Sequence, residues 1–443
     1  MTTAPTRTLI VGSGAREHAL AWKLAGEPGV DEVVVAPGSA AIGFEPRVRC
    51  LPGVDPLDPA AVVSAARSVA AELVVIGPEA PLAAGVVDAL IGAGFHVFGP
   101  TQGAARIESS KAFCHDVAAA AGVRMARARA FEAGDEAAAR AYVAELGAEG
   151  RGVVLKQDGL AAGKGVTVYG DIGLALDHLP SYLAAGRGPG PVLVVEERLV
   201  GQESSVIAIC DGREAVALPA SRDHKRLCDG DLGPNTGGMG AYSPLPDLAD
   251  DQVEAIIATV HRPILAELAR RGSPFIGFLY AGLMLTDEGP VLLECNARLG
   301  DPEAQVILPR LAGALGPVLA AAAAHRLEDA PLTVHPGATV GIVLASEGYP
   351  GTPTRGLPID GLEAAAAAGA LVFHGGSIGR PGGGFGTSGG RVLTVVGRGM
   401  DLAAARDGAE RAANRISWAG MQRRHDIAAV LPPEPAIAAG VTS

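Results

Sequence analysis

The sequence lacks the features of several protein classes. Its five cysteines form no C-x-x-C pair and their number is odd, which argues against a disulfide framework. The N-terminus is polar and has no apolar stretch typical of a secretory signal. The longest charge-free apolar run, Leu311 to Ala324, contains glycine and proline and is shorter than the ~20 residues that span a bilayer. We therefore expect a cytoplasmic protein in a reducing compartment, with no membrane contact.

Basic residues are also fewer than acidic residues. The chain has 36 Lys and Arg against 48 Asp and Glu, a formal net charge of −12. A negative field repels nucleic-acid backbones and anionic lipids, so we expect neither as a partner. Apolar residues make up 48% of the chain, which excludes disorder. At about 100–200 residues per domain, the 443 residues suggest two to four domains.

The order of apolar patterns predicts four consecutive blocks. From Thr8 to Pro100, β-branched runs alternate with helical patterns, which predicts a parallel βαβ sheet with a ligand crevice after its strands. Residues 125–195 predict a small glycine-rich block of strands around a helix. Residues 196–325 predict further strands and a helix that Pro263 should kink. The last hundred residues predict mainly strands, with a low-complexity loop from Gly375 to Gly390.

The first chemical motif is Gly12-Ser-Gly14-Ala-Arg16-Glu17-His18, between a predicted strand and a predicted helix. Glycines here allow backbone N–H groups to approach a phosphate at the positive end of the helix, and Arg16 adds a bidentate cation. Glu17 replaces the third glycine of a dinucleotide fingerprint, so an NAD site is unsupported. The alternative is a tight turn with a solvated Arg and Glu. We favour a phosphate or phosphosugar site.

The second motif, Val153 to Val166, is an apolar strand that ends in Lys156 and continues into a glycine loop. It differs from a P-loop because the spacing from Gly159 to Lys164 is one residue short and Gly165 stands where Ser or Thr would ligate magnesium. Two lysines beside a glycine loop can neutralise ATP phosphates and close over them as a lid. The alternative is a structural hairpin.

Oxygen-bearing side chains follow two other apolar strands. Glu196 and Glu203 could accept hydrogen bonds from an adenine amino group and from ribose hydroxyls, or lie solvated at the surface. Glu294 and Asn296 are two residues apart and share a strand face, which offers two oxygen ligands to Mg²⁺. Arg298 continues that face and would meet metal-bound phosphoryl oxygens. A capped turn with a surface ion pair is the alternative.

Two polar segments, Ser221 to Arg226 and the glycine-rich Gly233 to Gly240, predict substrate-binding loops. His224 lies between Asp and Lys, which is typical of an orienting or surface group rather than a catalytic base. We find no local arrangement of the Ser-His-Asp or Cys-His kind, so covalent catalysis has little support.

Taken together, these motifs resemble the phosphoribosylamine–glycine ligase (GAR synthetase) family of ATP-grasp enzymes over nearly the whole chain. The last of them, Arg-x-Gly-Asp-Pro-Glu, resembles the family signature. The segments that carry the resemblance are Gly12 to Leu20, Gly77 to Leu82, Gly159 to Val166, Asp223 to Arg226, Gly233 to Pro244, Gly277 to Leu283 and Arg298 to Glu303.

The resemblance implies a multidomain chain of the α/β and α+β classes. Its parts would be an N-terminal parallel βαβ domain that binds phosphoribosylamine (1–108), an ATP-grasp core (109–124 plus 196–325), a lid domain (125–195) and a mostly β C-terminal domain (330–435). The chain shows no extra domains of the kind found in fused versions, so we expect a monofunctional enzyme, and we expect a monomer.

The resemblance also implies a reaction of purine (IMP) biosynthesis: ATP, glycine and 5-phosphoribosylamine give glycinamide ribonucleotide, ADP and phosphate. The glycine carboxylate would attack the γ-phosphate of ATP to form an acyl phosphate, which the ribosylamine nitrogen then displaces. ATP and Mg²⁺ (or Mn²⁺) are the implied cofactors, and the two small-molecule substrates are the implied partners.

Residue roles carry over by matching position. ATP would be held by Lys111, Lys156, Gly159, Gly163, Lys164, Gly165, Glu196, Leu199 and Glu203. The substrates would contact Gly14, Arg16, Glu17, Pro78, Glu79, Lys225, Asn235, Arg298 and Gly300. The metal would bind Glu294 and Asn296, and the catalytic residues would be Arg298, Lys156, Asp223 and Asp301.

The chain departs from the family pattern at Ala15, Gln157 and Leu299, none of which removes a charged group. Its strand from Tyr280 to Met284 lacks the acid that many ATP-grasp enzymes carry, which argues against a strong second metal site.

Three other functions remain to be weighed. Another ATP-grasp ligase or carboxylase is the nearest, and the N-terminal block and Asp223 to Arg226 argue against it. An oxidoreductase would need an acid after the second strand, where Val33 to Val35 is followed by Ala-Pro-Gly. A silent nucleotide-binding module would be expected to lose Glu294, Asn296 or Arg298, and all three are present.

Overall fold

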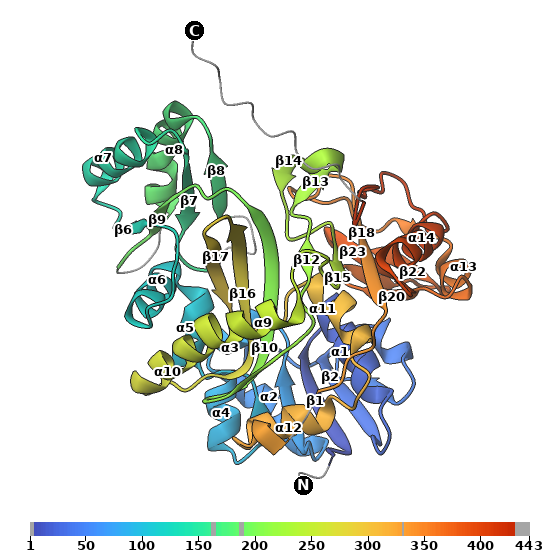
Figure 1. Cartoon of the computed structure of the whole chain (residues 1–443). Coiled ribbons are helices and arrows are strands. Elements are labelled where there is room, and N and C mark those ends of the chain that lie inside the picture. Colours follow the sequence, from blue (N-terminus) through green and yellow to red (C-terminus); the bar gives the residue numbers. More distant parts are fainter. Residues whose placement is uncertain (1–3, 161–164, 186–189, 330–331, 430–443) are drawn as a thin grey trace.

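The computed structural model of this chain describes residues 4–160, 165–185, 190–329 and 332–429. Figure 1 shows four blocks, three of them arranged around a central sheet. The N-terminal sheet lies at the bottom, a small block at the upper left, the sheet with β16 and β17 between them, and the C-terminal sheet at the right. No helix in these described residues is long and apolar enough to cross a bilayer.

The N-terminal block is a parallel sheet of order β3-β2-β1-β4-β5, as the βαβ pattern predicts. Its strands are β1 (Arg7–Gly12), β2 (Glu32–Pro37), β3 (Val48–Cys50), β4 (Leu73–Ile76) and β5 (Val97–Phe98). Its helices are α1 (Ala15–Ala25), α2 (Pro59–Ser68), α3 (Glu79–Ala83) and α4 (Val86–Gly92). Asp58 begins α2 by accepting a hydrogen bond from the Ala60 N–H. Helices α3 and α4 are separate because Gly85 adopts φ +79° between them.

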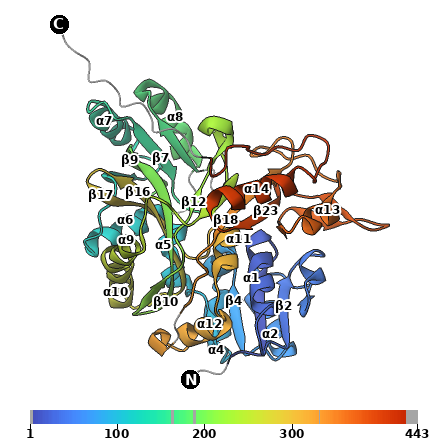
Figure 2. The same ribbon diagram turned by 45° about the vertical axis from the view of Figure 1, so that its right-hand side comes forward.

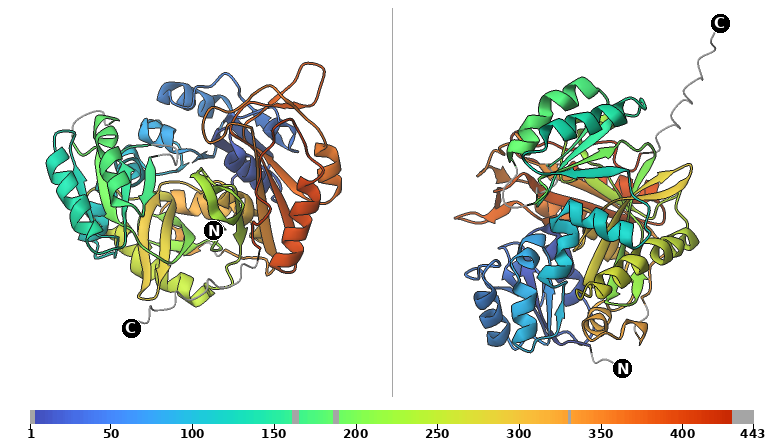
Figure 3. Two further views of the ribbon diagram at one scale, coloured as in Figure 1. Left: turned by 90° about the horizontal axis from the view of Figure 1, so that it is seen from above. Right: turned by 90° about the vertical axis from the view of Figure 1, so that its left-hand side faces the viewer.

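The small block pairs strands antiparallel in the order β6-β9-β7-β8. These are β6 (Ala128–Phe131), β7 (Val153–Gln157), β8 (Val166–Tyr169) and β9 (Leu193–Glu197). Helices α7 (Glu136–Gly147) and α8 (Ile172–Ala185) pack against them around a separate apolar core. This block forms the top of the molecule in the right-hand view of Figure 3.

The central sheet is antiparallel, in the order β11-β10-β16-β17. Its strands are β10 (Gln202–Asp211), β11 (Ala215–Ala217), β16 (Ile276–Thr286) and β17 (Gly289–Asn296). Around it lie α5 (Gln102–Ser109), α6 (Lys111–Ala120), α9 (Asp250–Ile256), α10 (Arg262–Arg270) and α12 (Gly316–Ala323), whereas α11 (Glu303–Ile307) packs against α1 and the C-terminal sheet. A π-helical turn at Ile257–His261 lies between α9 and α10, just before Pro263, and the kink predicted at this proline stays a prediction.

The C-terminal sheet has the order β12-β15-β18-β23-β20, with α14 (Leu402–Ala413) packed on β18 and β23 (Figure 2). Its strands are β12 (Arg222–Asp223), β15 (Gly240–Ser243), β18 (Ala338–Ala345), β20 (Leu371–His374) and β23 (Arg391–Gly399). Strands β12 and β15 lie within the predicted core, yet they pair in this sheet, because β15 runs beside β18. The predicted domain boundaries stay predictions. Of the residues near the predicted C-terminal domain, 330–331 and 430–435 lie outside the described part of the chain.

Short strands complete this region. Strands β13 (Arg226–Cys228) and β14 (Leu232–Asn235) form a hairpin. The segment expected to be a low-complexity loop contains two strands, so that expectation was wrong: β21 (Ser377–Gly379) and β22 (Phe385–Thr387) pair beside β19 (Pro358–Ile359) near α13 (Leu362–Ala367). The sequence did not indicate these strands, because glycines can form the backbone hydrogen bonds of a sheet without the β-branched side chains that are typical of strands.

Candidate functional site

Four cationic side chains surround one carboxylate on β17. Glu294 and Asn296 lie two residues apart on this strand, with Glu294 opposite Gly282 of β16. Burial alone would raise the pKa of Glu294, but nearby cations outweigh it and lower the pKa. These cations are Lys225, Lys156, Lys111 and Arg298. They come from four separate segments, and three of them also pair with other carboxylates, so the cluster is mixed in charge.

Lys156 reaches this cluster from the end of β7. Its Nζ lies 2.8 Å from Glu196 Oε2 and donates to the Leu293 carbonyl at 2.8 Å. The other oxygen of Glu196 lies 2.8 Å from His115 Nε2. Burial opposes ionisation of Glu196, but Lys156 and His115 together lower its pKa. Both oxygens of Glu196 are therefore engaged within the protein, and its predicted contact with adenine stays a prediction.

Lys111 is the first residue of α6, where Ser110 provides the N-cap. Asp158, at the end of β7, accepts hydrogen bonds from the Lys111 N–H at 2.5 Å and from the Ser110 hydroxyl at 3.0 Å. The Lys111 Nζ donates to the Gly159 carbonyl at 2.9 Å. These bonds attach the start of the glycine loop to α6. Asp158 was not among the predicted residues, because the helix start that it bonds lies 47 positions earlier in the chain and no local spacing marks this contact.

The predicted lid loop is only partly described. Gly159 adopts φ +102°, which few residues other than glycine tolerate, and Gly165 is buried at the start of β8. Gly163 and Lys164 lie outside the described residues. Leu199, after β9, is partly exposed.

The predicted substrate loops form a second set of paired charges. Lys225 Nζ lies 2.7 Å from Glu203 Oε2. Burial raises the pKa of Asp223 to about 7, and Lys225 partly opposes this shift. For Lys225, the carboxylates of Glu203 and Asp223 outweigh burial and raise the pKa. Asn235 lies on β14 opposite Arg226.

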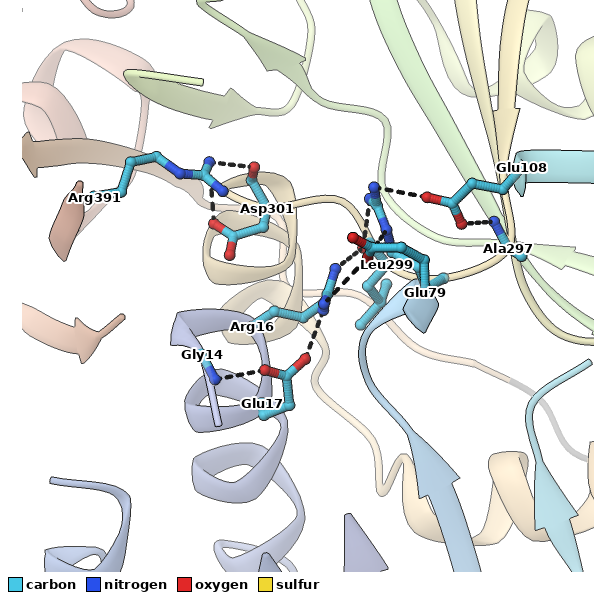
Figure 4. A network of polar contacts seen from close by, with 10 residues as sticks. Gly14, Arg16, Glu17, Glu79, Glu108, Ala297, Leu299, Asp301 and Arg391 are labelled. Carbon is cyan, nitrogen blue, oxygen red and sulfur yellow. Dashed lines mark hydrogen bonds and ion pairs between the residues drawn. The ribbon is translucent and has the colours of Figure 1, made fainter. Parts of the chain in front are cut away.

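Arg16 and Arg298 both contact Glu79, which follows β4 of the N-terminal sheet. Figure 4 shows Arg16 beside Glu79. Arg16 is buried, pairs with Glu17 at 2.7 Å, and donates to the Leu299 carbonyl at 3.1 Å. Glu79, next to Pro78 at the start of α3, lies 3.3 Å from Arg298 Nε and 3.9 Å from Arg16 Nη2. The two arginines that sequence motifs place 282 residues apart thus share one carboxylate.

The first glycine loop holds a side chain of its own helix. The Gly14 N–H donates to Glu17 Oε2 at 2.6 Å. A Cβ at Gly12 or Gly77 would lie 2.5 or 2.3 Å from the Glu17 side chain. The glycines therefore make room for Glu17. A phosphate at the Gly14 amide remains a prediction, and it requires that hydrogen bond to open.

Asp301 links the central region to the C-terminal sheet. Arg391 Nη1, on β23, lies 3.4 Å from Asp301 Oδ1 and donates to the Asp301 carbonyl at 2.6 Å. Burial opposes ionisation of Asp301, but Arg391 and Arg16 lower its pKa. Gly300 is required beside it, since a Cβ there would lie 2.5 Å from the Glu303 carboxylate. Arg391 was not predicted from the sequence.

A cavity of about 200 Å³ lies at this junction. It is bounded by the first glycine loop, by Asp301 and by the C-terminal sheet. Its lining residues are Gly14, Ala15, Asp301, Gly375, Gly376, Arg391, Val392, Leu393 and Thr394. The N-terminal block, the segment with Asp301 and the C-terminal sheet thus all contribute to the walls of one space.

The donor set on β17 suits a hard divalent cation. Glu294 and Asn296 offer a carboxylate and an amide oxygen on one strand face, and oxygen ligands are those that Mg²⁺ prefers. Among the described residues, no group of three or more His, Cys, Asp or Glu forms a complete metal site. Two protein oxygens fit a cation that takes its remaining ligands from water and substrate phosphates.

Comparison with known proteins identifies the family. Three domain profiles match in succession: the phosphoribosylglycinamide synthetase N domain over residues 6–108, the ATP-grasp (A) domain over 109–304 and the C domain over 339–430. The phosphoribosylamine–glycine ligase of Streptomyces coelicolor is 48% identical over 427 residues, which cover 96% of this chain and 99% of the relative. That of Leifsonia xyli is 46% identical and covers the same shares.

Solved structures of related proteins agree with this family assignment. The crystal structure of the phosphoribosylamine–glycine ligase of Thermotoga maritima matches with a TM-score of 0.76 at 32% identity, over 95% of this chain and 100% of that one. A biotin carboxylase of Campylobacter jejuni matches with a TM-score of 0.68 at 14% identity, over 95% and 93%, which shows a common fold alone. The predicted multidomain α/β and α+β class is confirmed. The chain belongs to the phosphoribosylglycinamide synthetase family of ATP-grasp ligases.

Proposed function

We propose that this ligase joins glycine to 5-phosphoribosylamine through a glycyl-phosphate intermediate, with ATP as the phosphoryl donor. Membership of the family makes the chain an ATP-using ligase that depends on a divalent metal. The observation that carries the proposal is the convergence of Lys111, Lys156, Lys225 and Arg298 on Glu294. A polyphosphate with a bound divalent cation matches this cluster of mixed charge, because its oxygens bind the cationic side chains and its cation binds the Glu294 carboxylate.

In this proposal the ATP phosphates lie between Lys111, Lys156 and the loop from Gly159 to Gly165. Glu196, which also contacts His115, holds Lys156 in place. Leu199 follows β9 and Glu203 lies on β10, where the nucleoside would extend. Glu294 and Asn296 would hold Mg²⁺ or Mn²⁺. The bound cation would draw negative charge from the phosphate oxygens during transfer.

The chemistry has two steps. A glycine carboxylate oxygen forms a bond to the γ-phosphorus of ATP, and the bond from that phosphorus to the bridging oxygen of ADP breaks. Arg298 stabilises the charge that develops on the transferring group. The ribosylamine nitrogen then attacks the acyl carbon, phosphate leaves, and the nitrogen loses a proton. Asp223 and Asp301 are proposed to contact the substrate amines.

The cavity beside Asp301 is proposed to take the phosphoribosylamine. Its walls come from the first glycine loop, Asp301 and the C-terminal sheet. Arg16 and Glu17 directly follow Ala15 of its lining in the chain, and Glu79 lies 3.9 Å from Arg16. Gly300, Pro78, Lys225 and Asn235 complete the proposed substrate contacts. The monomeric state and the cytoplasmic location also remain predictions.

A phosphate-release assay with ATP and Mg²⁺ tests the overall reaction. We expect sustained phosphate release only when glycine and 5-phosphoribosylamine are both present. Equal release with another amino acid, and none with glycine, would refute the substrate assignment.

Positional isotope exchange tests the intermediate. ATP labelled with ¹⁸O at the β,γ-bridging oxygen should scramble its label when glycine is added without the ribosylamine, because glycyl phosphate formation frees the β-phosphate of ADP to rotate. Scrambling that requires both substrates would contradict a glycyl phosphate formed in advance.

A further inference from the structure

Glu108, in the last turn of α5, binds the segment that carries the proposed catalytic arginine. Its Oε1 lies 2.9 Å from Arg298 Nη2, and its Oε2 accepts a hydrogen bond from the Ala297 N–H at 2.7 Å. The Glu108 side chain is only 6% exposed. None of the roles proposed above uses it.

These two bonds fix both the backbone and the side chain of one short segment. Ala297 stands between Asn296, a proposed metal ligand, and Arg298. A carboxylate is planar, so two bonds to its two oxygens define the direction of the guanidinium relative to the end of β17. Figure 4 shows Glu108 beside Ala297, on the far side of the network from Glu17.

Glu79 also contacts Arg298 but constrains it less. The distance from Glu79 Oε2 to Arg298 Nε is 3.3 Å, and the Glu79 side chain is 29% exposed. Glu79 also lies near Arg16, and no hydrogen bond among the described residues joins its side chain to the backbone after β17. Among the described contacts of Arg298, the one to Glu108 is therefore the more buried and the shorter.

Neither helix formation nor burial explains a glutamate at this position. Residue 108 lies at the C-terminal end of α5, where the helix dipole disfavours an anion. Burial raises the pKa of Glu108, although Arg298 opposes the shift. A buried carboxylate at a helix C-terminus is costly, and its bonds to Arg298 and Ala297 are what offset that cost.

We propose that Glu108 is a positioning residue that holds Arg298, and the backbone next to Asn296, in the orientation needed for phosphoryl transfer. The proposal rests on the proposed function of Arg298. Glu108 has no role toward substrate in this scheme, so its effect on the reaction should pass through Arg298.

The test compares Glu108→Gln, Arg298→Ala and the double variant. A glutamine keeps an acceptor for the Ala297 N–H but removes the charge that faces Arg298. We expect Glu108→Gln to lower kcat about 10- to 100-fold, as for other residues that orient an active group, with KM for ATP changed less than about threefold. Arg298→Ala should lower kcat by about 10²–10³. The double variant should be no slower than Arg298→Ala.

Chemical rescue gives a readout that a purely structural role would not move. Millimolar guanidinium added to Arg298→Ala should restore part of kcat, because the vacated site keeps the Glu108 carboxylate. In the double variant the same guanidinium should restore at least tenfold less, since the carboxylate is gone. This comparison remains valid if either variant is somewhat less stable, because each protein is its own reference.

Glu27→Gln is the matched control. Glu27 is also a buried carboxylate that accepts two hydrogen bonds, from the Leu315 and Gly316 N–H groups at the start of α12. It lies outside the proposed site, so this variant should lose thermal stability without loss of kcat.

The outcomes separate the two proposals. An unchanged kcat in Arg298→Ala would refute the proposed role of Arg298 itself. If Arg298→Ala is slow but the losses of the two single variants multiply in the double variant, Glu108 acts independently and the positioning role is overturned. An unchanged kcat in Glu108→Gln, or equal guanidinium rescue with and without Glu108, would overturn it as well.

Discussion

The buried pair of Lys156 and Glu196 should separate folding stability from ATP binding. Their side chains are 8% and 2% exposed, and the two charged atoms lie 2.8 Å apart. Lys156→Met removes the lysine charge and leaves Glu196 with His115 as its remaining partner. Breaking a buried ion pair from one side costs about 3–5 kcal/mol. Because His115 stays in place, we expect a loss of unfolding free energy near the lower end, about 3 kcal/mol.

The pH dependence of this loss follows from the carboxylate. Without Lys156, burial should raise the folded-state pKa of Glu196 above its unfolded value. A carboxyl group with a raised folded pKa loses stability as the pH rises through that pKa, because the folded state binds more protons than the unfolded state. Lys156→Met should therefore be less destabilised at pH 6 than at pH 8.

The double variant Lys156→Met/Glu196→Gln removes both charges. Its stability loss should be smaller than the sum of the two single losses by about 1–3 kcal/mol, the coupling typical of residues in contact. ATP affinity should behave differently. Both variants that lack Lys156 should bind ATP about ten- to a hundredfold more weakly, because one charge-assisted hydrogen bond contributes about 1.5–3 kcal/mol.

Urea unfolding at pH 6, 7 and 8, together with calorimetric titration of ATP and Mg²⁺, measures both quantities. Additive stability losses would refute the coupling between the two side chains. Wild-type ATP affinity in Lys156→Met would refute the assignment of this lysine to the nucleotide.

Three further predictions concern other parts of the molecule. Arg16→Ala should raise KM for phosphoribosylamine and lower kcat much less than Arg298→Ala does, because Arg16 is proposed to bind this substrate. Equal kcat losses in the two variants, with an unchanged KM, would contradict this division between substrate binding by Arg16 and catalysis by Arg298. His261 is fully buried and burial lowers its pKa to about 4, so between pH 6.5 and 4 the unfolded state binds a proton at this residue and the folded state does not. As the pH is lowered through that range, the free energy of unfolding should decrease by up to about 1.4 kcal/mol per pH unit. His261→Gln should flatten this slope in urea unfolding at pH 7 and 5. Gly397→Ala would place a Cβ 2.1 Å from a carbonyl oxygen of α14 and should lower the unfolding free energy by about 1–3 kcal/mol. Gly92→Ala is the control, because its Cβ would meet no atom within 4 Å. Equal melting temperatures of the two variants would show that α14 can shift without cost.

The sequence was sufficient for features that depend on neighbouring residues. Alternating β-branched runs and helical patterns predicted the parallel N-terminal sheet, because apolar periodicity follows directly from the geometry of strands and helices. The two-residue spacing of Glu294 and Asn296 placed both side chains on one strand face for the same reason. The ordered motifs also resembled the family that the comparisons confirm.

Contacts between distant segments were decided only by the tertiary structure. Glu108 bonds to a backbone 189 positions later, Arg391 to one 90 positions earlier, and His115 to a carboxylate 81 positions later. In the sequence, a glutamate or histidine on a helix is typical of a solvated face, and no local spacing marks it otherwise. Their roles arise because folding removes them from water beside an opposite charge or an unpaired backbone group, and burial makes such a contact necessary.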